Sequence, residues 1–403
     1  MHFTQTRLAT IDTYVTLFIM LMYYYMYKYY TKSFYDTPLY KTLVPLGISG
    51  IFFGLSVASK WTGLYAGVGL ALIFFITLYY RYREYRYALL SPDGETDGIS
   101  HKHVINSFMR NTVITLLFCC VMFIAVPFAI YVISYIPYMA TPSGEGLKTI
   151  FTNAQSMLVY HGKTVVNSTH SYSSHWYEWP IMYRPMWYYA NTLSNGMKQG
   201  ISAFGNPAVW WIGIGAVAYN IALAVIIPLK KKDYFNKNKY SYAVVYSAIF
   251  AVLCAVSYLV SADNEKLVRL FPCVLLYSTV IVGTFIIVLM FDDKIKADSN
   301  SVALFLLIGY FSSYMPWMLV MRTTYIYHYF PSVIFVVLMI AYSIKTIYDS
   351  ANNKKAVIIG TLVYGLIAIG LFVLFYPTLS GQPISLEFAD KYLKWFQSWV
   401  LVA

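Results

Sequence analysis

Charged side chains are scarce in this chain of 403 residues: they make up 11% of it, against about a quarter in an ordinary soluble domain. Hydrophobic residues make up 59%, and long apolar runs recur along the chain. A soluble globular protein is therefore excluded, and the composition indicates a chain whose solvent is mostly lipid. The net charge of +12 lies largely in loops between the apolar runs, so no nucleic-acid partner is predicted.

Cysteine is also scarce, and its positions argue against two kinds of site. The four cysteines lie inside apolar runs, without the spacing of a metal site or a disulfide framework: Cys119, Cys120, Cys254 and Cys273. We interpret them as packing residues and predict no metal. No signal peptide is visible, because Met1 leads within about ten residues into an apolar stretch without a basic region or a cleavage site.

About ten apolar runs are long enough to cross the hydrocarbon core of a bilayer as helices. They predict spans near 11–27, 42–58, 61–80, 111–138, 208–229, 240–262, 270–291, 302–321, 325–344 and 356–376. The predicted fold class is therefore an all-α polytopic membrane protein. One long segment outside these spans is rich in Trp and Tyr, and it divides the chain into 1–138, the loop 139–207, and 208–403.

The distribution of lysine and arginine predicts which side of the membrane each loop faces. Most of the 29 Lys and Arg residues lie in alternate loops, at 28–41, 81–110, 230–239, 294–296 and 345–355. Cytoplasmic loops carry such an excess, so these loops are predicted to face the cytoplasm of a cell-membrane protein. Both termini, the 139–207 loop, the Lys60–Trp61 junction, the 262–269 loop and the 322–328 turn are then predicted to face outside.

Ionisable residues are placed at the ends of the predicted spans. Several spans have no Asp, Glu, Lys, Arg or His in their interiors, whereas Arg7, Asp12, Lys60, Arg322 and His328 lie at predicted outer ends. Ion-coupled transporters bind their substrates near the midplane of the membrane, so this pattern argues against one. It predicts a site at the outer membrane surface.

The stretch 170–189 combines histidines, a carboxylate and an arginine with many aromatic residues. One interpretation is an interfacial aromatic belt, which alone accounts for tryptophans. The other is a sugar site, because sugar rings stack on aromatic faces while His and Glu side chains hydrogen-bond to hydroxyl groups. The candidate residues are His170, His175, Trp176, Glu178, Trp179 and Arg184.

Two cationic residues lie in short turns that are predicted to face outside, and each has two possible roles. Lys60, beside Trp61, is either a lysine that reaches toward the headgroups or a cation that meets a lipid phosphate in a partly dehydrated place. Arg322, which precedes the aromatic turn 325–331, has the same two interpretations. His328 is not predicted to bind a metal, because no second ligand stands at helical spacing from it.

Four ordered motifs carry a resemblance to a known family. They are Thr-Arg-Leu-Ala-Thr-Ile-Asp at 6–12, Ser-Lys-Trp-Thr-Gly-Leu at 59–64, the stretch 170–189, and Pro316-Trp317 followed by Arg322 and Tyr327–Pro331. Together they resemble the protein O-mannosyltransferases, and more closely the bacterial members that use polyprenyl-phosphate sugars. The resemblance implies a GT-C membrane fold and inverting transfer of mannose from a lipid phosphate to a Ser or Thr hydroxyl outside the cytoplasm. It implies no cofactor, since the lipid-linked sugar is a substrate.

The sequence departs from that family at its beginning. In the family an adjacent Asp and Glu in the first external loop supply the catalytic carboxylate, about three helices before the motif that matches 6–12. We therefore expect this chain to be an N-terminally truncated member, with 1–138 a partial N-terminal region, and we assign no catalytic residue within it. Arg7, Lys60, Arg184 and Arg322 remain as cations for the departing phosphate, and neither Asp12 nor Glu178 is assigned the missing carboxylate's role.

Mannose transfer to protein is thus the predicted function, with a polyprenyl-phosphate-linked sugar, a hydroxyl acceptor and membrane lipid as partners. One alternative is a related lipid-carrier-dependent transferase that modifies a cell-wall polymer or a glycolipid. The other is a polytopic transporter or flippase, which the uncharged interiors of the spans disfavour.

Overall fold

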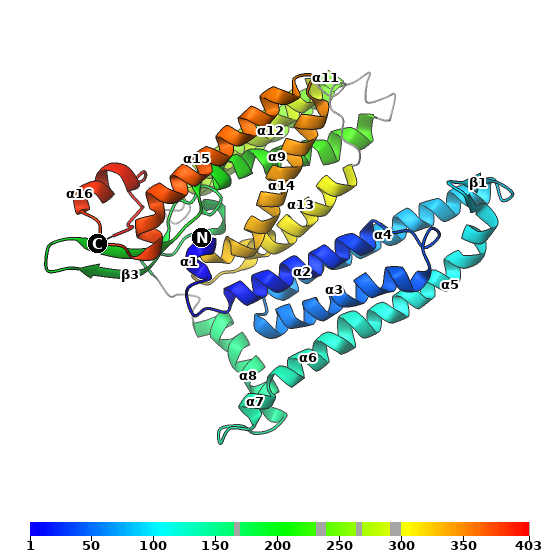
Figure 1. Cartoon of the computed structure of the whole chain (residues 1–403), viewed down its shortest axis with the longest axis horizontal. Coiled ribbons are helices and arrows are strands. Elements are labelled where there is room, and N and C mark those ends of the chain that lie inside the picture. The colour runs from blue at the N-terminus through cyan, green and yellow to red at the C-terminus, as the bar shows by residue number, and fades with distance from the viewer. Residues whose placement is uncertain (165–169, 231–238, 263–267, 291–299, 403) are drawn as a thin grey trace. The chain divides into compact units, whose positions relative to one another are not determined.

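The computed structural model describes residues 1–164, 170–230, 239–262, 268–290 and 300–402. Within these residues nine helices are long and apolar enough to cross a membrane, which is the architecture of a multi-pass membrane protein. Helices dominate because hydrocarbon offers the backbone no hydrogen-bond partner, and a helix satisfies its N–H and C=O groups within one segment. Figure 1 shows these helices and two small antiparallel hairpins, β1 (Glu95–Thr96) with β2 (Ile99–Ser100) and β3 (Met186–Thr192) with β4 (Lys198–Ala203).

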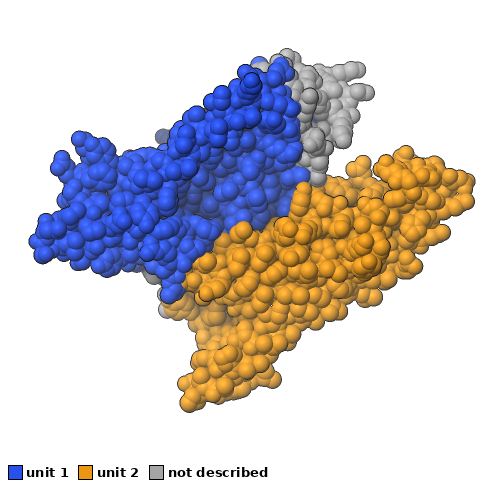
Figure 2. Space-filling view, viewed as in Figure 1, with its two compact units in different colours: residues 1–9, 168–310, 323–403 blue, residues 10–167, 311–322 orange. Residues whose placement is uncertain are grey.

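The chain forms two compact units, which Figure 2 shows in different colours. Unit 1 comprises residues 1–9, 168–310 and 323–403, and unit 2 comprises residues 10–167 and 311–322. Neither unit is a continuous stretch of the sequence. Residues that are far apart along the chain therefore meet within each unit.

Unit 2 is built mainly from long helices that run alongside one another (Figure 1). The span from α5 to α7 is continuous, and a π-helical turn, η1, interrupts its α-helical hydrogen bonding. The elements are α2 (Asp12–Tyr30), α3 (Leu39–Ser59), α4 (Gly63–Leu90), α5 (His101–Cys120), η1 (Val121–Ala125), α6 (Val126–Ser134), α7 (Ile136–Met139), α8 (Lys148–Val159), η2 (Tyr160–Thr164) and η6 (Met315–Leu319).

Close packing of α3 against η1 depends on a glycine. A Cβ atom added at Gly50 would lie 2.3 Å from the backbone oxygen of Met122, which is closer than any real Cβ contact. Small residues at helix interfaces let two backbones approach in a membrane, where packing rather than water exclusion holds helices together. Gly50 therefore sets the separation of α3 from η1.

Unit 1 contains the remaining long helices and the longer hairpin. Its elements are α1 (His2–Gln5), η3 (Trp176–Glu178), β3, β4, α9 (Pro207–Lys230), α11 (Lys239–Ala262), α12 (Leu270–Met290), most of α13 (Asn300–Tyr314), η7 (Ile326–Tyr329), α14 (Phe330–Ser350), α15 (Lys354–Ser380), α16 (Leu386–Phe388) and η8 (Ala389–Leu393). Buried side chains of α9, α12 and α13 form an apolar core: Ala222, Leu223, Ile226, Phe285, Val288, Leu289 and Ala303. The buried Asn220 amide of α9 donates hydrogen bonds to the Met339 carbonyl and the Ser343 hydroxyl of α14, at 3.3 and 3.1 Å.

The observed helices confirm the predicted helical membrane fold, and a long helix runs through most of each predicted span. The largest differences are at two ends, since α4 continues to Leu90 and α5 begins at His101. The extra residues at these two helix ends are rich in polar side chains, so a prediction from hydropathy alone leaves them out of the spans. The span predicted near 11–27 is the 19-residue helix α2, whose many tyrosines leave it outside the nine most apolar helices.

A buried arginine holds the connection between α2 and α3 against α4. Arg81 of α4 is 1% exposed, and its guanidinium donates to the Tyr29 hydroxyl at 2.5 Å and to the Lys32 carbonyl at 2.7 Å. The guanidinium carbon also lies 3.9 Å from the centroid of the Phe34 ring. The guanidinium group is planar, donates several hydrogen bonds at once and stacks on aromatic rings. A lysine ammonium group at position 81 could not make the same set of contacts.

We expect Arg81→Lys to lower the thermal unfolding midpoint of the purified protein, because the lysine retains the charge but loses the forked hydrogen bonds. Hydrogen bonds to charged groups contribute about 1.5–3 kcal/mol each. Arg83→Lys is the matched control, since Arg83 lies two residues further along α4 and is exposed. Equal midpoints for the two variants would show that the buried fork does not stabilise the connection.

Candidate functional site

The Lys60–Trp61 motif forms the tight turn between α3 and α4. Lys60 leaves the helix with an extended backbone, at φ −159° and ψ 134°, and α4 begins at Gly63. The Lys60 Nζ atom donates to the Asp12 Oδ1 atom at 2.6 Å, and the two side chains are 23% and 13% exposed. Asp12 is the first residue of α2, where the helix dipole also favours a carboxylate. The ion pair therefore joins the first residue of α2 to the residue that follows α3.

A cavity of about 530 Å³ opens beside this turn within unit 2. Its polar lining comes from the ends of several helices: Ser59, Lys60, Trp61, Tyr131, Ser134, Tyr135, Tyr138, Asn153 and His161. The Trp61 indole donates to the Tyr131 hydroxyl at 3.2 Å, which in turn lies 3.3 Å from the Tyr135 hydroxyl. Aromatic faces and hydroxyl groups around one ammonium group suit a ligand that is both anionic and rich in hydroxyls.

His161 is a cavity residue that the sequence did not indicate. It lies in η2 and is exposed, but partial desolvation, followed by the positive charges of Arg322 and Lys60, lowers the pKa of its imidazole below the usual 6.5. Arg322 and Lys60 thus act on the same imidazole. They are 262 positions apart in the sequence, but both belong to unit 2. A lone histidine in a long loop has no spacing pattern that would have revealed this position.

Arg322 follows η6, whose tryptophan fixes the segment in unit 2. Trp317 is buried, and its ring meets the Tyr65 ring of α4 edge-on at 5.7 Å. Because Arg322 lies five residues after this anchor, the packing of Trp317 limits where its guanidinium can reach. Asp12, Lys60, Trp61 and Arg322 all belong to unit 2, whereas the other predicted site residues belong to unit 1.

In unit 1 the stretch 170–189 is fixed by a buried carboxylate. Glu178 is 1% exposed, its Oε2 atom accepts from the His175 backbone N–H at 2.8 Å, and its Oε1 atom accepts from Arg269 at 3.0 Å. The first contact caps the short helix η3, and the second neutralises the buried charge. Sequence reasoning missed Arg269, although it placed the 262–269 loop on the same side as Glu178.

The same stretch contacts the turn 324–329, which the sequence treated as a separate motif. The Ser174 N–H donates to the Thr324 carbonyl at 2.9 Å, and the Thr324 hydroxyl donates to the Ser174 carbonyl at 2.8 Å. Trp179 is fully buried and stacks on His328, with ring centroids 6.0 Å apart. The two motifs therefore form one packed structure, in which Trp179 and His328 are interior residues.

The remaining predicted residues of unit 1 lie closer to its surface. His170 and His175 are exposed, and their rings contact Tyr325 at 5.4 Å and Tyr177 at 5.2 Å. Trp176 meets the Tyr177 ring edge-on, and Arg184 donates to the Ser171 carbonyl at 2.8 Å. Arg7 is exposed, with its guanidinium carbon 4.9 Å from the Phe3 ring centroid.

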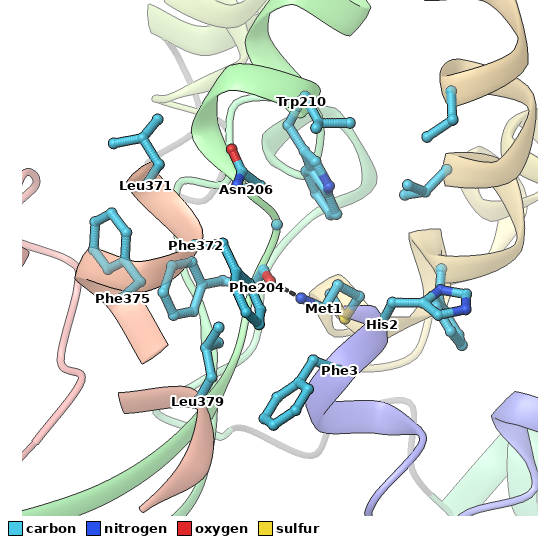
Figure 3. Close-up of a pocket in the computed structure, with 15 residues that line it drawn as sticks. Met1, His2, Phe3, Phe204, Asn206, Trp210, Leu371, Phe372, Phe375 and Leu379 are labelled. Carbon is cyan, nitrogen blue, oxygen red and sulfur yellow. Dashed lines mark hydrogen bonds between the residues drawn. The ribbon is translucent and has the colours of Figure 1, made fainter. Parts of the chain in front are cut away.

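Unit 1 contains a cavity of about 340 Å³ whose lining is almost entirely apolar (Figure 3). Trp210, Phe372 and other side chains of α9, α14 and α15 line it, together with Met1, His2 and Phe3 at the start of the chain. Its one amide, Asn206, is already satisfied: it donates to the Ala368 carbonyl at 2.7 Å and accepts from the Ala208 N–H at 3.0 Å. The Met1 amine also has a partner, because it donates to the Phe204 carbonyl, so the cavity offers less polar chemistry than the cavity beside Lys60.

Family models match the chain along most of its length. A model described as dolichyl-phosphate-mannose-protein mannosyltransferase matches residues 1–139. A second model, described as the C-terminal four TMM region of protein-O-mannosyltransferase, matches residues 147–262 and 256–399.

A curated relative and a solved structure agree with these models. Polyprenol-phosphate-mannose–protein mannosyltransferase of Corynebacterium glutamicum is 24% identical over 203 residues, which cover 42% of this chain and 35% of that protein. The match thus spans about a third of the curated relative's length. The structure of the S. cerevisiae protein O-mannosyltransferase Pmt1–Pmt2 complex bound to the sugar donor matches 96% of this chain and 73% of that chain, with a TM-score of 0.56 and 11% identity.

At that level of identity the structural match establishes the fold, which is the GT-C membrane fold. The family models establish more, because together they match most of the chain in the order that the motifs predicted. The chain belongs to the protein O-mannosyltransferase family.

Proposed function

We propose that this protein takes part in the transfer of mannose from polyprenyl-phosphate mannose to Ser or Thr hydroxyls of proteins, with inversion at the sugar. The observation that carries the proposal is the polar cavity beside Lys60, in a chain that protein O-mannosyltransferase models match along most of its length. The excess of Lys and Arg in alternate loops supports a place for this cavity at the outer face of the cell membrane. The lipid-linked sugar is a substrate, and the proposal includes no cofactor.

In this reaction the acceptor oxygen attacks C1 of mannose while the bond between C1 and the phosphate oxygen breaks. The electron pair of that bond stays on the phosphate, so cations that stabilise the departing phosphate lower the barrier. Lys60 and Arg322 are the cations whose charges act together at His161, beside the cavity. We assign them to the phosphate. His170, His175 and Trp176 remain candidate sugar or acceptor contacts because they lie toward the surface of unit 1.

The hydroxyl proton of the acceptor needs a base. Asp12 and Glu178 are both held in ion pairs, with Lys60 and Arg269, and Glu178 also caps η3. These contacts give both carboxylates a structural role, so we assign the role of general base to neither residue. The resemblance to the family implies an acidic pair outside the motifs present here.

The direct test is transfer in proteoliposomes that contain the protein, radiolabelled polyprenyl-phosphate mannose and a Ser- and Thr-containing peptide. We expect label on the peptide, removable by α-mannosidase if the configuration is inverted from a β-linked donor. Label that appears only on a glycolipid or polymer acceptor would favour the alternative function, a lipid-carrier-dependent transferase that modifies a cell-wall polymer or a glycolipid. An absence of any transfer by the full-length protein would contradict the proposed function.

Lys60→Gln and Arg322→Gln should each lower transfer about tenfold or more, because a charge-assisted hydrogen bond to phosphate contributes about 1.5–3 kcal/mol. Lys41→Gln is the control, since Lys41 is an exposed lysine at the opposite end of α3. Arg322→Lys retains the charge but loses bidentate contact, so it should fall between the parent and Arg322→Gln.

Asp12→Asn separates a phosphate role of Lys60 from a purely structural one. It breaks the ion pair as Lys60→Gln does, but it leaves the ammonium group in place. We expect Asp12→Asn to retain carrier binding that Lys60→Gln loses, measured with polyprenyl phosphate and the protein in nanodiscs. Equal losses in the two variants would mean that Lys60 only anchors α2 to α3.

The positive field at His161 gives a titration that reports on the phosphate. His161 has a lowered pKa because partial desolvation and the charges of Arg322 and Lys60 disfavour the imidazolium. Bound phosphate offsets that repulsion, so the pKa should rise on binding, and binding should take up protons as the pH falls toward 6. NMR titration of labelled histidines, assigned with His161→Gln, measures both effects. A pKa that does not change with polyprenyl phosphate or with Lys60→Gln would exclude this placement of the phosphate.

A further inference from the structure

After the short helix η3 the chain reverses direction through an unusual helix end. The Met182 N–H donates to the Trp179 carbonyl at 2.9 Å, and the Tyr183 N–H donates to the Glu178 carbonyl at 3.1 Å. This pair of bonds is the Schellman motif, in which one residue adopts the left-handed conformation and is usually glycine. Here that residue is Met182, with φ +57° and a fully buried side chain. A residue with a side chain rarely adopts this conformation, so the surrounding structure must hold it there.

The three carbonyl groups of residues 181–183 each accept a hydrogen bond from a distant side chain. The first accepts from the Trp211 indole of α9 at 3.2 Å. The second accepts from the Trp399 indole at 2.7 Å, and the third accepts from the Ser398 hydroxyl. Two of these three donors belong to residues 394–402, which we call the C-terminal segment. The 181–183 turn is therefore fixed by parts of unit 1 that are remote in the sequence.

Trp399 is itself held in place by the packing of unit 1. It is 1% exposed, and its ring lies 5.4 Å from the Phe204 ring and 5.8 Å from the Phe375 ring, measured between centroids. The Leu401 carbonyl accepts from the Ser202 hydroxyl of β4 at 3.3 Å, which places the C-terminal segment beside the hairpin (Figure 1). The indole N–H is thus a fixed donor for the turn.

Contacts through Arg269 connect the turn to the exposed start of η3. The Arg269 guanidinium carbon lies 4.5 Å from the centroid of the Tyr183 ring. Arg269 pairs with Glu178 at 3.0 Å, and Glu178 accepts from the His175 backbone N–H at 2.8 Å. A shift of the turn would therefore move the residues at which η3 begins, and with them the side chains of His175 and Trp176.

We propose that Trp399 is a positioning residue, which holds the 181–183 turn and thereby sets His175 and Trp176 for contact with the protein acceptor. This inference rests on the proposed function and adds to it a role for the C-terminal segment. The acceptor is the ligand that these side chains are left to contact, because the cavity beside Lys60 already offers hydroxyl and aromatic groups to the sugar. The indole N–H carries the effect, since it is the group that bonds to the turn.

Trp399→Phe removes the N–H and keeps an aromatic ring, so it tests the positioning role. In proteoliposomes that contain the full-length protein, we expect the KM for a Ser- and Thr-containing peptide to rise about fivefold, whereas the KM for polyprenyl-phosphate mannose and kcat change less than about twofold. An unchanged peptide KM, or a change in the donor KM instead, would overturn the proposal.

Trp395→Phe is the matched control in the same segment. The Trp395 ring stacks on the Trp399 ring with centroids 6.0 Å apart, but its indole donates to the Tyr392 carbonyl at 2.9 Å rather than to the turn. We expect this variant to retain the parental peptide KM. An equal rise in the peptide KM of both variants would mean that the packing of the C-terminal segment matters and not the bond from Trp399, which would contradict the positioning role.

A double-mutant cycle with Met182→Gly shows whether Trp399 acts through the left-handed residue. Glycine adopts that conformation without strain, so the turn should depend less on the indole bond. We expect Trp399→Phe to raise the peptide KM less in the Met182→Gly background than in the parent, and additive effects would overturn the proposal. If Met182→Gly does not fold, hydrogen exchange of the Tyr183 N–H gives the answer: it should be faster in Trp399→Phe than in Trp395→Phe. Equal exchange in the two variants would overturn the proposal as well.

The outcomes distinguish this inference from the function on which it rests. Mannose transfer with a parental peptide KM in Trp399→Phe would overturn the positioning role and leave the function intact. A full-length protein that transfers no mannose, although the Tyr183 N–H exchanges faster in Trp399→Phe, would overturn the function. It would also show that Trp399 only stabilises the fold.

Discussion

The hydrocarbon solvent is the constraint on which the rest of this structure depends. In lipid every backbone group must find its partner within the protein, and an unpaired charge is expensive, so the chain folds as helices and keeps most of its ionisable groups near their ends. The described charges follow this rule. Lys60 and Asp12 meet at the junction of helix ends, and Arg81 is buried only because two oxygen acceptors and aromatic rings surround its guanidinium.

This constraint also explains why polar and apolar cavity linings lie in succession along the helices of unit 2. The ends of α3 and α6 contribute ammonium, indole and hydroxyl groups to the cavity beside Lys60, while residues deeper in the same helices are apolar. A lipid-linked sugar has the same succession of parts.

Unit 1 uses its aromatic residues differently from unit 2. There the stretch 170–189 and the turn 324–329 support each other through Ser174 and Thr324, with Trp179 packed on His328 in the interior. Glu178 has a structural task in capping η3 and pairing with Arg269. The aromatic residues of this stretch thus serve to fix a loop in place.

The sequence by itself determined the membrane fold, because runs of apolar residues have only one way to satisfy their backbone in lipid, and it determined the family through ordered motifs. It also pointed to Lys60 and Arg322 as candidates, since cations at the ends of spans stand out against an apolar background. Only the tertiary structure decided which residues meet. Neither the ion pair of Asp12 with Lys60, the contact of Glu178 with Arg269, nor the place of His161 has a local pattern, because each joins segments that approach only when the helices pack.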